Sequence, residues 1–500
     1  MYYLPGGYGY EKNIKEQYLS GWSADNQYVI GHLVSAYVYA GYDAESGAFY
    51  GAPEDFIKKA VEIANAIKGL PNPPESFRAF IIPSSTNQTV AGSWYQVPYG
   101  SIELYKSSGN TGISDGNPNY SLAGAQYGVF HGESQVATLT TNEQGYAKVD
   151  NLEVLDEGDS YTIRELSASP GFAIDVESHK VSVTPEGTAT VKVKEIPQNQ
   201  PLDLLLQKLD ADLNEAKPQG SGSLSGAEFT VKFYTEQMDT DPAQSEKEPE
   251  RTWIFKTDSS GAIRFSKEFF VSGDDFYYAS DGKTICLPLG TVTIQETKAP
   301  AGYQLNNTVF MQKIVGTGNE ETISVFNAPK IEDAIFRGGV KVQKRDLETN
   351  GTAPQGGASL ANAVFTITTL NEQPVVVNGK TYEKGQPVLT LSTNEAGLAS
   401  TANNVLPIGH YRIDETTPPS GYLGEGTLSR EFDITENGKI VDLTGENSSI
   451  SNQIIRGGVK SKNATLKPAA RLRRAARNFP GQNSRLQAQY PACCCKRKNL

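Results

Sequence analysis

The sequence predicts a mainly β protein, in which tandem immunoglobulin-like β-sandwiches follow an N-terminal α+β domain fragment. Three near-identical segments begin at Tyr161, Val292 and Tyr411, and each runs as an alternating strand, an acid, then Pro, Gly and an aromatic residue. The chain is also rich in Gly, Pro and Tyr and in runs of Val, Thr and Ile, which favour strands joined by turns. Five hundred residues exceed one ordinary core, so three or four domains are expected.

The internal repeat sets the domain boundaries. Each unit opens with an alternating strand that carries a lysine, continues with an aromatic strand, a Gly turn and the acid-bearing strand, and ends on a closing strand. The predicted closing strands are "TVKVKEIPQ", "TISVFNAPK" and "SSISNQIIR". Short strands at this spacing predict antiparallel sandwiches, which we place at 100–198, 199–334 and 335–456.

The sequence pattern of residues 1–99 differs from that of the repeats. The stretch "DFIKKAVEIANAIKGL" has apolar residues at helical spacing and is followed by the helix-stopping "PNPPESF". The stretch "QYVIGHLVSAYVYAGY" fits either a helix or a buried strand. We therefore expect a separate α+β domain in 1–99.

The charge is unevenly distributed. Of the 45 basic residues, 12 lie in 456–500, where there is no acid, so the rest of the chain carries 33 basic and 57 acidic residues, a formal charge of about −24. An acidic body argues against nucleic-acid binding and suits a surface-exposed protein. Cys286 is isolated and the other cysteines are the run Cys493 to Cys495, which excludes a disulfide framework. Adjacent cysteines can bind metal, but without a second cluster no metal site is expected.

A lysine and an acid point toward the core in every unit. The lysines are Lys106, Lys208 and Lys344, and the acids are Glu165, Glu296 and Glu415; all have apolar residues two positions away. Burial lowers the pKa of a lysine, and the neutral amine is a nucleophile. Beside an Asn carboxamide, and with a protonated acid to move protons, it can form a Lys–Asn isopeptide bond and expel ammonia.

These motifs resemble the B-type repeat domain of Gram-positive collagen adhesins and pilins, the CnaB or SpaA-like family, over about 100–455. The resemblance rests on the lysine strand, the E-x-x-x-P-x-G-[YF] strand and the final Asn strand. It implies a bond from Lys344 to Asn452 promoted by Glu415. It also implies a bond from Lys208 to Asn327 promoted by Glu296.

The first unit departs from the pattern. Glu195, in "VKEIP", occupies the position that Asn327 holds in "VFNAP". A carboxylate is a poorer acyl donor than a carboxamide, so we expect Lys106 to form a buried ion pair with Glu165 or Glu195. A cross-link from Lys106, with Glu165 as its promoting acid and Asn199 nearby, is the alternative.

Residues 1–99 resemble the C-terminal part of a thioester-type adhesin domain, on "MYYLPGGYGY", "VIGHLVSAYVY" and "SFRAFIIP…SWYQVPYG". A thioester needs a Cys and a Gln. No Cys precedes Cys286, and His32 stands at the apparent Gln position. We expect either that this chemistry is lost, with His32 an ordinary structural residue, or that the Cys belongs upstream of Met1.

The tail 457–500 starts like a fourth repeat, because "RGGVK" recurs at Arg337 and Arg456, and then loses the pattern. Codons that encode "VQKRDLET" can also encode "SKNATLK" when they are read in a shifted frame. In the same way, codons for "QPVVVNGKTY" can encode "ACCCKRKNL". We therefore hypothesise that 461–500 is an out-of-frame copy and that the tail has no regular structure. The alternative is a basic amphipathic helix that binds membranes or nucleic acid.

Together these features predict a non-enzymatic adhesin or pilin-like stalk of the cell surface. Its only chemistry would be self-directed isopeptide formation, with no cofactor. The alternative is a secreted protein with carbohydrate-binding modules, although Trp22, Trp94 and Trp253 are scattered. We expect a host surface or matrix ligand, a sortase acting on the intact relative, and an extracellular, wall-attached location. Signal peptide, anchor and membrane span are all expected to be missing from this chain.

Overall fold

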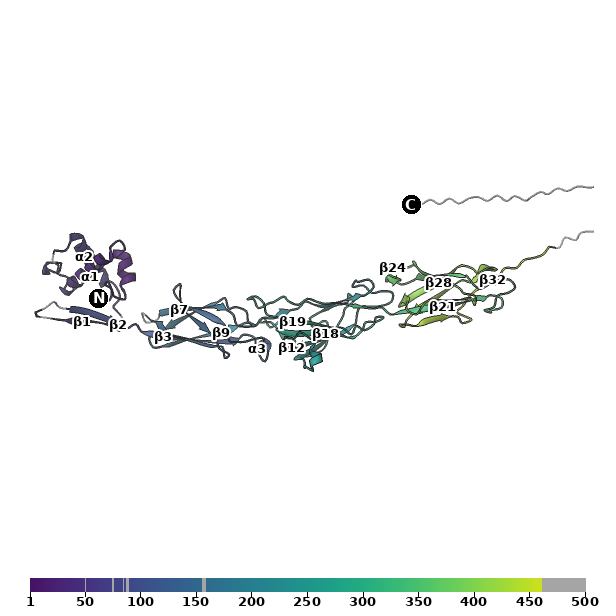
Figure 1. Cartoon of the computed structure of the whole chain (residues 1–500), viewed down its shortest axis with the longest axis horizontal. Coiled ribbons are helices and arrows are strands. Elements are labelled where there is room, and N and C mark those ends of the chain that lie inside the picture. The colour runs from purple at the N-terminus through teal and green to yellow at the C-terminus, as the bar shows by residue number, and fades with distance from the viewer. Residues whose placement is uncertain (50, 74–75, 84, 87–89, 155–158, 461–500) are drawn as a thin grey trace, which may run out of the picture. The chain divides into compact units, whose positions relative to one another are not determined.

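The computed structural model describes residues 1–49, 51–73, 76–83, 85–86, 90–154 and 159–460 (Figure 1). The hypothesis of an out-of-frame tail at 461–500, with Cys493 to Cys495, falls outside the described residues. Met1–Ile454 form one unit by their contacts. Among the residues described, no helix is both long and apolar enough to cross a membrane.

The N-terminal region contains helices and one β-hairpin. Its elements are η1 (Glu11–Leu19), α1 (Ala24–Tyr39), η2 (Ala44–Ser46), α2 (Glu54–Lys68), β1 (Phe77–Ile82) and β2 (Val90–Tyr95). The predicted helix at 55–70 is α2, which follows Pro53 and buries Ala60, Ile63 and Ala64. The ambiguous stretch at 27–42 is helical and falls largely in α1, whose N-cap Ser23 accepts a hydrogen bond from the Asn26 N–H. The mixed α+β prediction is confirmed.

Each of the three sandwiches consists of two main sheets. In the first, sheet β6-β3-β9 faces sheet β5-β4-β7-β8. The strands are β3 (Tyr99–Ser108), β4 (Gln126–His131), β5 (Ser134–Thr140), β6 (Tyr146–Glu153), β7 (Asp159–Ser167), β8 (Ser178–Val183) and β9 (Thr188–Glu195), with one short helix, α3 (Thr111–Ser114).

The second sandwich packs sheet β14-β11-β20 against sheet β15-β13-β12-β18-β19, with a small sheet β10-β17-β16 beside them. Its elements are β10 (Gln200–Pro201), β11 (Leu204–Asp210), β12 (Glu228–Tyr234), η3 (Pro242–Ser245), β13 (Arg251–Lys256), β14 (Ala262–Arg264), β15 (Phe270–Gly273), β16 (Tyr277–Tyr278), β17 (Ile285–Leu287), β18 (Gly290–Lys298), β19 (Val309–Ile314) and β20 (Lys330–Asp333).

The third sandwich packs sheet β26-β21-β32-β29, which β27 and β31 extend, against sheet β25-β22-β28-β30, with the hairpin β23-β24. Its strands are β21 (Arg337–Asp346), β22 (Val364–Thr369), β23 (Val375–Val377), β24 (Lys380–Tyr382), β25 (Pro387–Ser392), β26 (Leu398–Ser400), β27 (Leu406–Pro407), β28 (Gly409–Thr417), β29 (Tyr422–Thr427), β30 (Ser429–Ile434), β31 (Ile440–Leu443) and β32 (Ile450–Ile454).

Two features of the sheets differ from the expectation. The closing strand runs parallel to the lysine strand and is hydrogen-bonded to it, in the pairs β3/β9, β11/β20 and β21/β32, whereas the sequence predicted antiparallel sheets. In the second sandwich the predicted closing strand at 322–330 does not form, and β20 takes its place. Each pair of sheets still encloses its own apolar core.

Candidate functional site: a buried lysine in each sandwich

The lysine strand of each sandwich points its lysine into the core. Lys106 is 3 % exposed, and Lys208 and Lys344 are 0 % exposed. The cause is the pleat, because Ile102 and Leu104 precede Lys106 on the buried face of β3. Removing an ammonium from water is costly unless it finds charged or hydrogen-bonding partners. Each lysine therefore marks a site whose chemistry depends on its neighbours.

The acid lies on a strand of the opposite sheet, where it pairs with an aromatic residue of the neighbouring strand. Glu165 pairs with Tyr127, Glu296 with Phe229 and Glu415 with Phe365. In all three sandwiches the register shifts at this pair, which is a β-bulge directly after the acid. The acid side chains are at most 1 % exposed, so the predicted inward direction of the three acids is confirmed.

The parallel register identifies the third member of each site. Two residues after the lysine, Ser108 pairs with Glu195, Asp210 with Asp333, and Asp346 with Asn452. The same position of the closing strand therefore carries Glu195, Asp333 and Asn452 in the first, second and third sandwich. All three are buried.

The predicted pairing of Lys208 with Asn327 is wrong in this structure. Asn327 is exposed and lies outside any strand, and its backbone N–H donates to Oε1 of Gln312 (3.1 Å). Glutamine side chains occupy the backbone groups of this segment, since Gln200 Oε1 accepts the N–H groups of Val325 (2.6 Å) and Phe326 (3.1 Å). Pairing with β11 begins only at the end of this segment, where the Gln207 N–H donates to the Pro329 carbonyl (3.0 Å) and β20 starts at Lys330.

In the third sandwich, one carboxylate bridges the lysine and the asparagine. Lys344 Nζ lies 3.0 Å from Glu415 Oε1, and Asn452 Nδ2 donates to Glu415 Oε2 at 2.7 Å. Burial lowers the pKa of the Lys344 amine to about 8, against the attraction of Glu415. Within the described part of the chain, Asn452 Oδ1 has no hydrogen-bond donor. The predicted trio of Lys344, Glu415 and Asn452 is thus brought together.

In the second sandwich, the lysine lies between two acids. Lys208 Nζ is 2.6 Å from Glu296 Oε1 and 2.5 Å from Asp333 Oδ1. Glu296 Oε2 also accepts the backbone N–H of Asn306 (2.8 Å). Burial raises the pKa of Asp333 to about 6, with Lys208 opposing the rise and Glu296 adding to it. Lys208 and Glu296 are thus in contact, and the third residue beside them is Asp333.

In the first sandwich, Lys106 Nζ contacts Glu195 Oε2 and donates to Ser169 Oγ (2.6 Å), while Glu165 Oε1 is farther away at 3.7 Å. The Tyr127 hydroxyl donates to the other oxygen of Glu195. Burial raises the pKa of Glu165 to about 8, helped by Glu195, and burial lowers the pKa of Lys106 against the pull of both carboxylates. The expected ion pair is present, and its partner is Glu195.

Asn199, the alternative partner of Lys106, is engaged elsewhere. Its side chain is 0 % exposed and donates to Glu321 Oε1 (3.2 Å) and to the Pro197 carbonyl (3.4 Å).

A second polar contact beside two of the lysines was not predicted from the sequence. Asp210 is fully buried, and its Oδ2 accepts the Tyr303 hydroxyl (2.8 Å); Asp346 Oδ2 accepts the Tyr422 hydroxyl (2.9 Å) in the same way. This bond ties the end of the lysine strand to the segment after the acid strand. The signal was present, because K-x-D and P-x-G-Y occur together in the second and third units. Ser108 and Phe172 replace the pair in the first.

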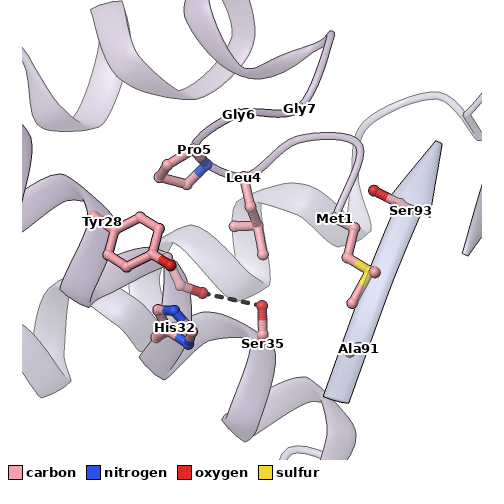
Figure 2. Close-up of a pocket in the computed structure, with 12 residues that line it drawn as sticks. Met1, Leu4, Pro5, Gly6, Gly7, Tyr28, His32, Ser35, Ala91 and Ser93 are labelled. Carbon is pink, nitrogen blue, oxygen red and sulfur yellow. Dashed lines mark hydrogen bonds between the residues drawn. The ribbon is translucent and has the colours of Figure 1, made fainter. Parts of the chain in front are cut away.

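His32 lies on α1 and lines two adjoining cavities of about 230 and 420 Å³. Figure 2 shows it beside Tyr28, whose ring centroid is 4.7 Å from that of His32, and near Ser35, whose hydroxyl donates to the Gly31 carbonyl (3.0 Å). Because the first cysteine of the sequence is Cys286, 1–99 contain no thiol for a thioester. His32 therefore has no partner for that chemistry within this region.

Comparisons with known proteins follow the same division of the chain. The sequence model of the thioester domain matches residues 1–74, and that of the SpaA prealbumin-like fold domain matches 102–197, 211–329 and 340–449. No curated protein matches the sequence.

Several solved structures resemble parts of this chain. The Bacillus anthracis TIE protein is 22% identical, with 75% of this chain and 57% of that one covered and a TM-score of 0.44. BcpA, the major pilin subunit of Bacillus cereus, is 16% identical, with 71% and 100% covered and a TM-score of 0.26. The pilus adhesin SpaC from Lactobacillus rhamnosus GG is 15% identical, with 75% and 46% covered and a TM-score of 0.26. This chain thus spans little more than half the length of the TIE protein.

Proposed function

Because the chain belongs to the family with SpaA prealbumin-like fold domains, we propose that it is a cell-surface adhesin or pilin-like stalk held together by self-formed isopeptide bonds. The observation that carries the proposal is the shared register position. It places an acyl group, from Asn452 or Asp333, beside a buried lysine and a buried glutamate.

In the third sandwich the bond joins Lys344 Nζ to Cγ of Asn452. The amine attacks in its neutral form, which the lowered pKa of about 8 makes accessible. Glu415 contacts both nitrogen atoms, so it can take the proton lost by the attacking amine and pass it to the departing one. One C–N bond forms, another breaks, and ammonia leaves.

In the second sandwich the bond joins Lys208 Nζ to Cγ of Asp333, and water leaves. A protonated carboxyl is a better acyl donor than a carboxylate, and the raised pKa of Asp333 favours the protonated form. Glu296 lies 2.6 Å from the lysine and shuttles the protons. Asp333, and not Asn327, is thus the proposed acyl donor. Lys208 and Glu296 keep the roles predicted for them.

Such bonds suit a load-bearing stalk. Tension on the chain enters each sandwich near its lysine strand and leaves after its closing strand, and these two strands are neighbours. A covalent bond between them carries the load before the sheets separate. The protein would be extracellular and attached to the cell wall, with a host ligand and, in the intact relative, a sortase as partners. It would catalyse no reaction on other molecules.

The tryptophans give no support to the alternative of carbohydrate-binding modules. Trp253 is fully buried in a core, and Trp22 packs edge-on against Phe56 at 4.9 Å. Trp94 alone of the three is exposed, so these side chains form no row on which a sugar could stack.

Intact-protein mass tests the proposal. Loss of one ammonia and one water predicts a mass about 35 Da below that of the sequence. Lys344→Ala should restore about 17 Da and Lys208→Ala about 18 Da, after correction for the substitution. Asn327→Ala is the matched control and should change neither loss. A wild-type chain of full calculated mass would refute the proposal.

A further inference from the structure

The first sandwich differs from the other two at three positions that meet at the lysine. The closing strand carries Glu195 instead of Asp333 or Asn452. The aromatic residue opposite the acid is Tyr127, where the other sandwiches have Phe229 and Phe365. Four residues after the acid stands Ser169, where the other two have Pro300 and Pro419. Two of these changes add a hydroxyl group to a buried site.

Both hydroxyl groups contact the ion pair. Ser169 Oγ accepts a hydrogen bond from Lys106 Nζ (2.6 Å), and the Tyr127 hydroxyl donates to Glu195 Oε1. The Lys106 ammonium also lies over the Phe172 ring, 5.0 Å from its centroid. The side chains of Lys106, Glu165 and Glu195 are 0 % exposed, so these contacts substitute for water.

These contacts are of the kind that complements the charges of an ion pair, and they oppose the burial that lowers the pKa of Lys106. A hydroxyl oxygen that accepts from an amine stabilises the ammonium, and a hydroxyl that donates to a carboxylate stabilises the anion. Amide formation needs the reverse, an amine with a free electron pair and an uncharged acyl group. With Glu165 protonated, one cation and one anion remain, and the buried cluster is neutral.

The other two sites lack such hydroxyl partners. The carboxyl group of Asp333 contacts Lys208 Nζ at 2.5 Å and the side chain of Glu296. Within the described part of the chain, Lys344 Nζ has only Glu415 as a charged partner, and Asn452 Oδ1 has no donor. Lys208 contacts two carboxylates and Lys344 contacts one, but within the described residues neither site adds a hydroxyl group to these contacts.

From this contrast we propose that the first sandwich keeps Lys106 and Glu195 as a permanent non-covalent ion pair, and that it is the segment that unfolds and lengthens under a load which the two cross-linked sandwiches resist. The inference that the first sandwich lengthens under load (the mechanical half) rests on the proposed function. The inference that Lys106 and Glu195 stay an ion pair (the chemical half) rests only on the contacts around Lys106.

The position of the ion pair determines how much chain is released. Lys106 lies near the end of β3 and Glu195 at the end of β9, so a bond between them would shield 107–194 from tension. Without a bond this segment unravels once the ion pair and the β3/β9 pairing separate. At about 3.3–3.6 Å per residue, the release is roughly 300 Å of chain.

Single-molecule stretching of the full chain, held at both ends, tests the mechanical half. We expect one extension of roughly 300 Å from the first sandwich and no comparable extension from the second or third. Absence of the first event overturns the inference. If all three sandwiches extend, the isopeptide bonds of the proposed function are absent, and the first sandwich is not the only one that lengthens. That result would leave the inferred ion pair between Lys106 and Glu195 unaffected.

Peptide mapping tests the chemical half separately. In the wild type, Lys106 and Glu195 should appear in separate peptides, and a joined peptide lighter by one water overturns the inference. The triple variant Glu195→Asn, Tyr127→Phe, Ser169→Pro copies the third site. It should gain a cross-link, with a further loss of about 17 Da, and lose the roughly 300 Å event.

A single substitution separates the role of the hydroxyl groups from that of the acyl donor. Glu195→Asn alone keeps both hydroxyl groups and should cross-link to a smaller fraction than the triple variant. Equal cross-linking overturns the role given to Tyr127 and Ser169. Should the triple variant not fold, the wild-type peptide map still decides the chemical half.

Discussion

Lys344 and Asn452 meet at a single carboxylate, with the lysine nitrogen 3.0 Å from one oxygen of Glu415 and the asparagine nitrogen 2.7 Å from the other. The two residues lie on neighbouring parallel strands and are separated in sequence by most of the sandwich. An acid in this position can serve both nitrogen atoms without moving. The arrangement explains why an acid points into an apolar core at this place.

Replacing this acid should prevent the bond. Glu415→Gln keeps the shape of the side chain but cannot carry the proton between the two nitrogens. We expect the third sandwich to retain its ammonia, so that the mass deficit of the chain falls by about 17 Da. Glu425→Gln, an exposed change in β29, is the control and should leave the deficit intact. An unchanged deficit in Glu415→Gln would show that the acid is not required.

The identity of the leaving group can be switched in the second sandwich. Asp333→Asn converts the acid into the carboxamide found at Asn452, so ammonia should leave instead of water. The deficit relative to the calculated mass should drop by about 1 Da, whereas Asp333→Ala should abolish the second loss completely. High-resolution mass measurement of the peptide that contains Lys208 distinguishes these outcomes. A deficit that Asp333→Ala leaves untouched would assign the bond to another residue.

Removing the cross-link should destabilise the third sandwich. The proposed bond would close a loop of roughly 100 residues, for which the chain-entropy treatment of cross-links gives about 4–5 kcal/mol. Asn452→Ala removes the bond while Lys344 keeps its contact with Glu415, so no buried charge is left alone. Denaturant unfolding should show a free energy of unfolding lower by this amount. A loss below about 1 kcal/mol would mean that the wild type holds no cross-link there.

The first sandwich should lose stability as the pH rises. Burial raises the pKa of Glu165 from its ordinary 4.5 to about 8, so the folded state holds this proton more tightly than the unfolded state does. The contribution of Glu165 is therefore complete below about pH 4.5 and is lost as the pH rises through about 8. The Tm of this sandwich should fall between these values, and Glu165→Gln should flatten the dependence. A Tm that rises over this range would contradict the assignment.

The buried aspartate beside Lys208 should depend on its tyrosine. Tyr303→Phe removes the hydroxyl that donates to Asp210 Oδ2 and should cost the second sandwich about 1–3 kcal/mol. The double variant Asp210→Ser, Tyr303→Phe copies Ser108 and Phe172 of the first sandwich and should recover part of the loss. Chemical denaturation of the two variants makes the comparison. Equal stability of Tyr303→Phe and wild type would show that this hydrogen bond is dispensable.

Much of the architecture follows from local sequence pattern. The period-two alternation predicted the inward lysines and acids, because a strand between two sheets has one buried face. The sequence could not decide the form of 27–42, since an apolar run fits a helix and a buried strand equally well. Packing against α2 accompanies the helical form.

The wrong prediction for Asn327 shows where a local sequence pattern cannot predict the pairing of strands. The segments "TVKVKEIP" and "TISVFNAP" look alike, but only the first becomes a strand next to the lysine. In the second, Gln200 and Gln312 occupy the backbone groups that a strand would use. Those contacts come from residues distant in sequence, so the register that selects Asp333 cannot be read from the segment itself. The hydroxyls of Tyr127 and Ser169, in contrast, could have been found by aligning the repeats.

The parallel pairing of the lysine strand with the closing strand also bears on proteolysis. Between Lys344 and Asn452 lie exposed turns, such as the one at Gly385, that a protease can reach. If the two strands are joined covalently, a cut in such a turn divides the polypeptide but leaves its two pieces attached. A nicked sandwich would then still carry tension from its lysine strand to its closing strand.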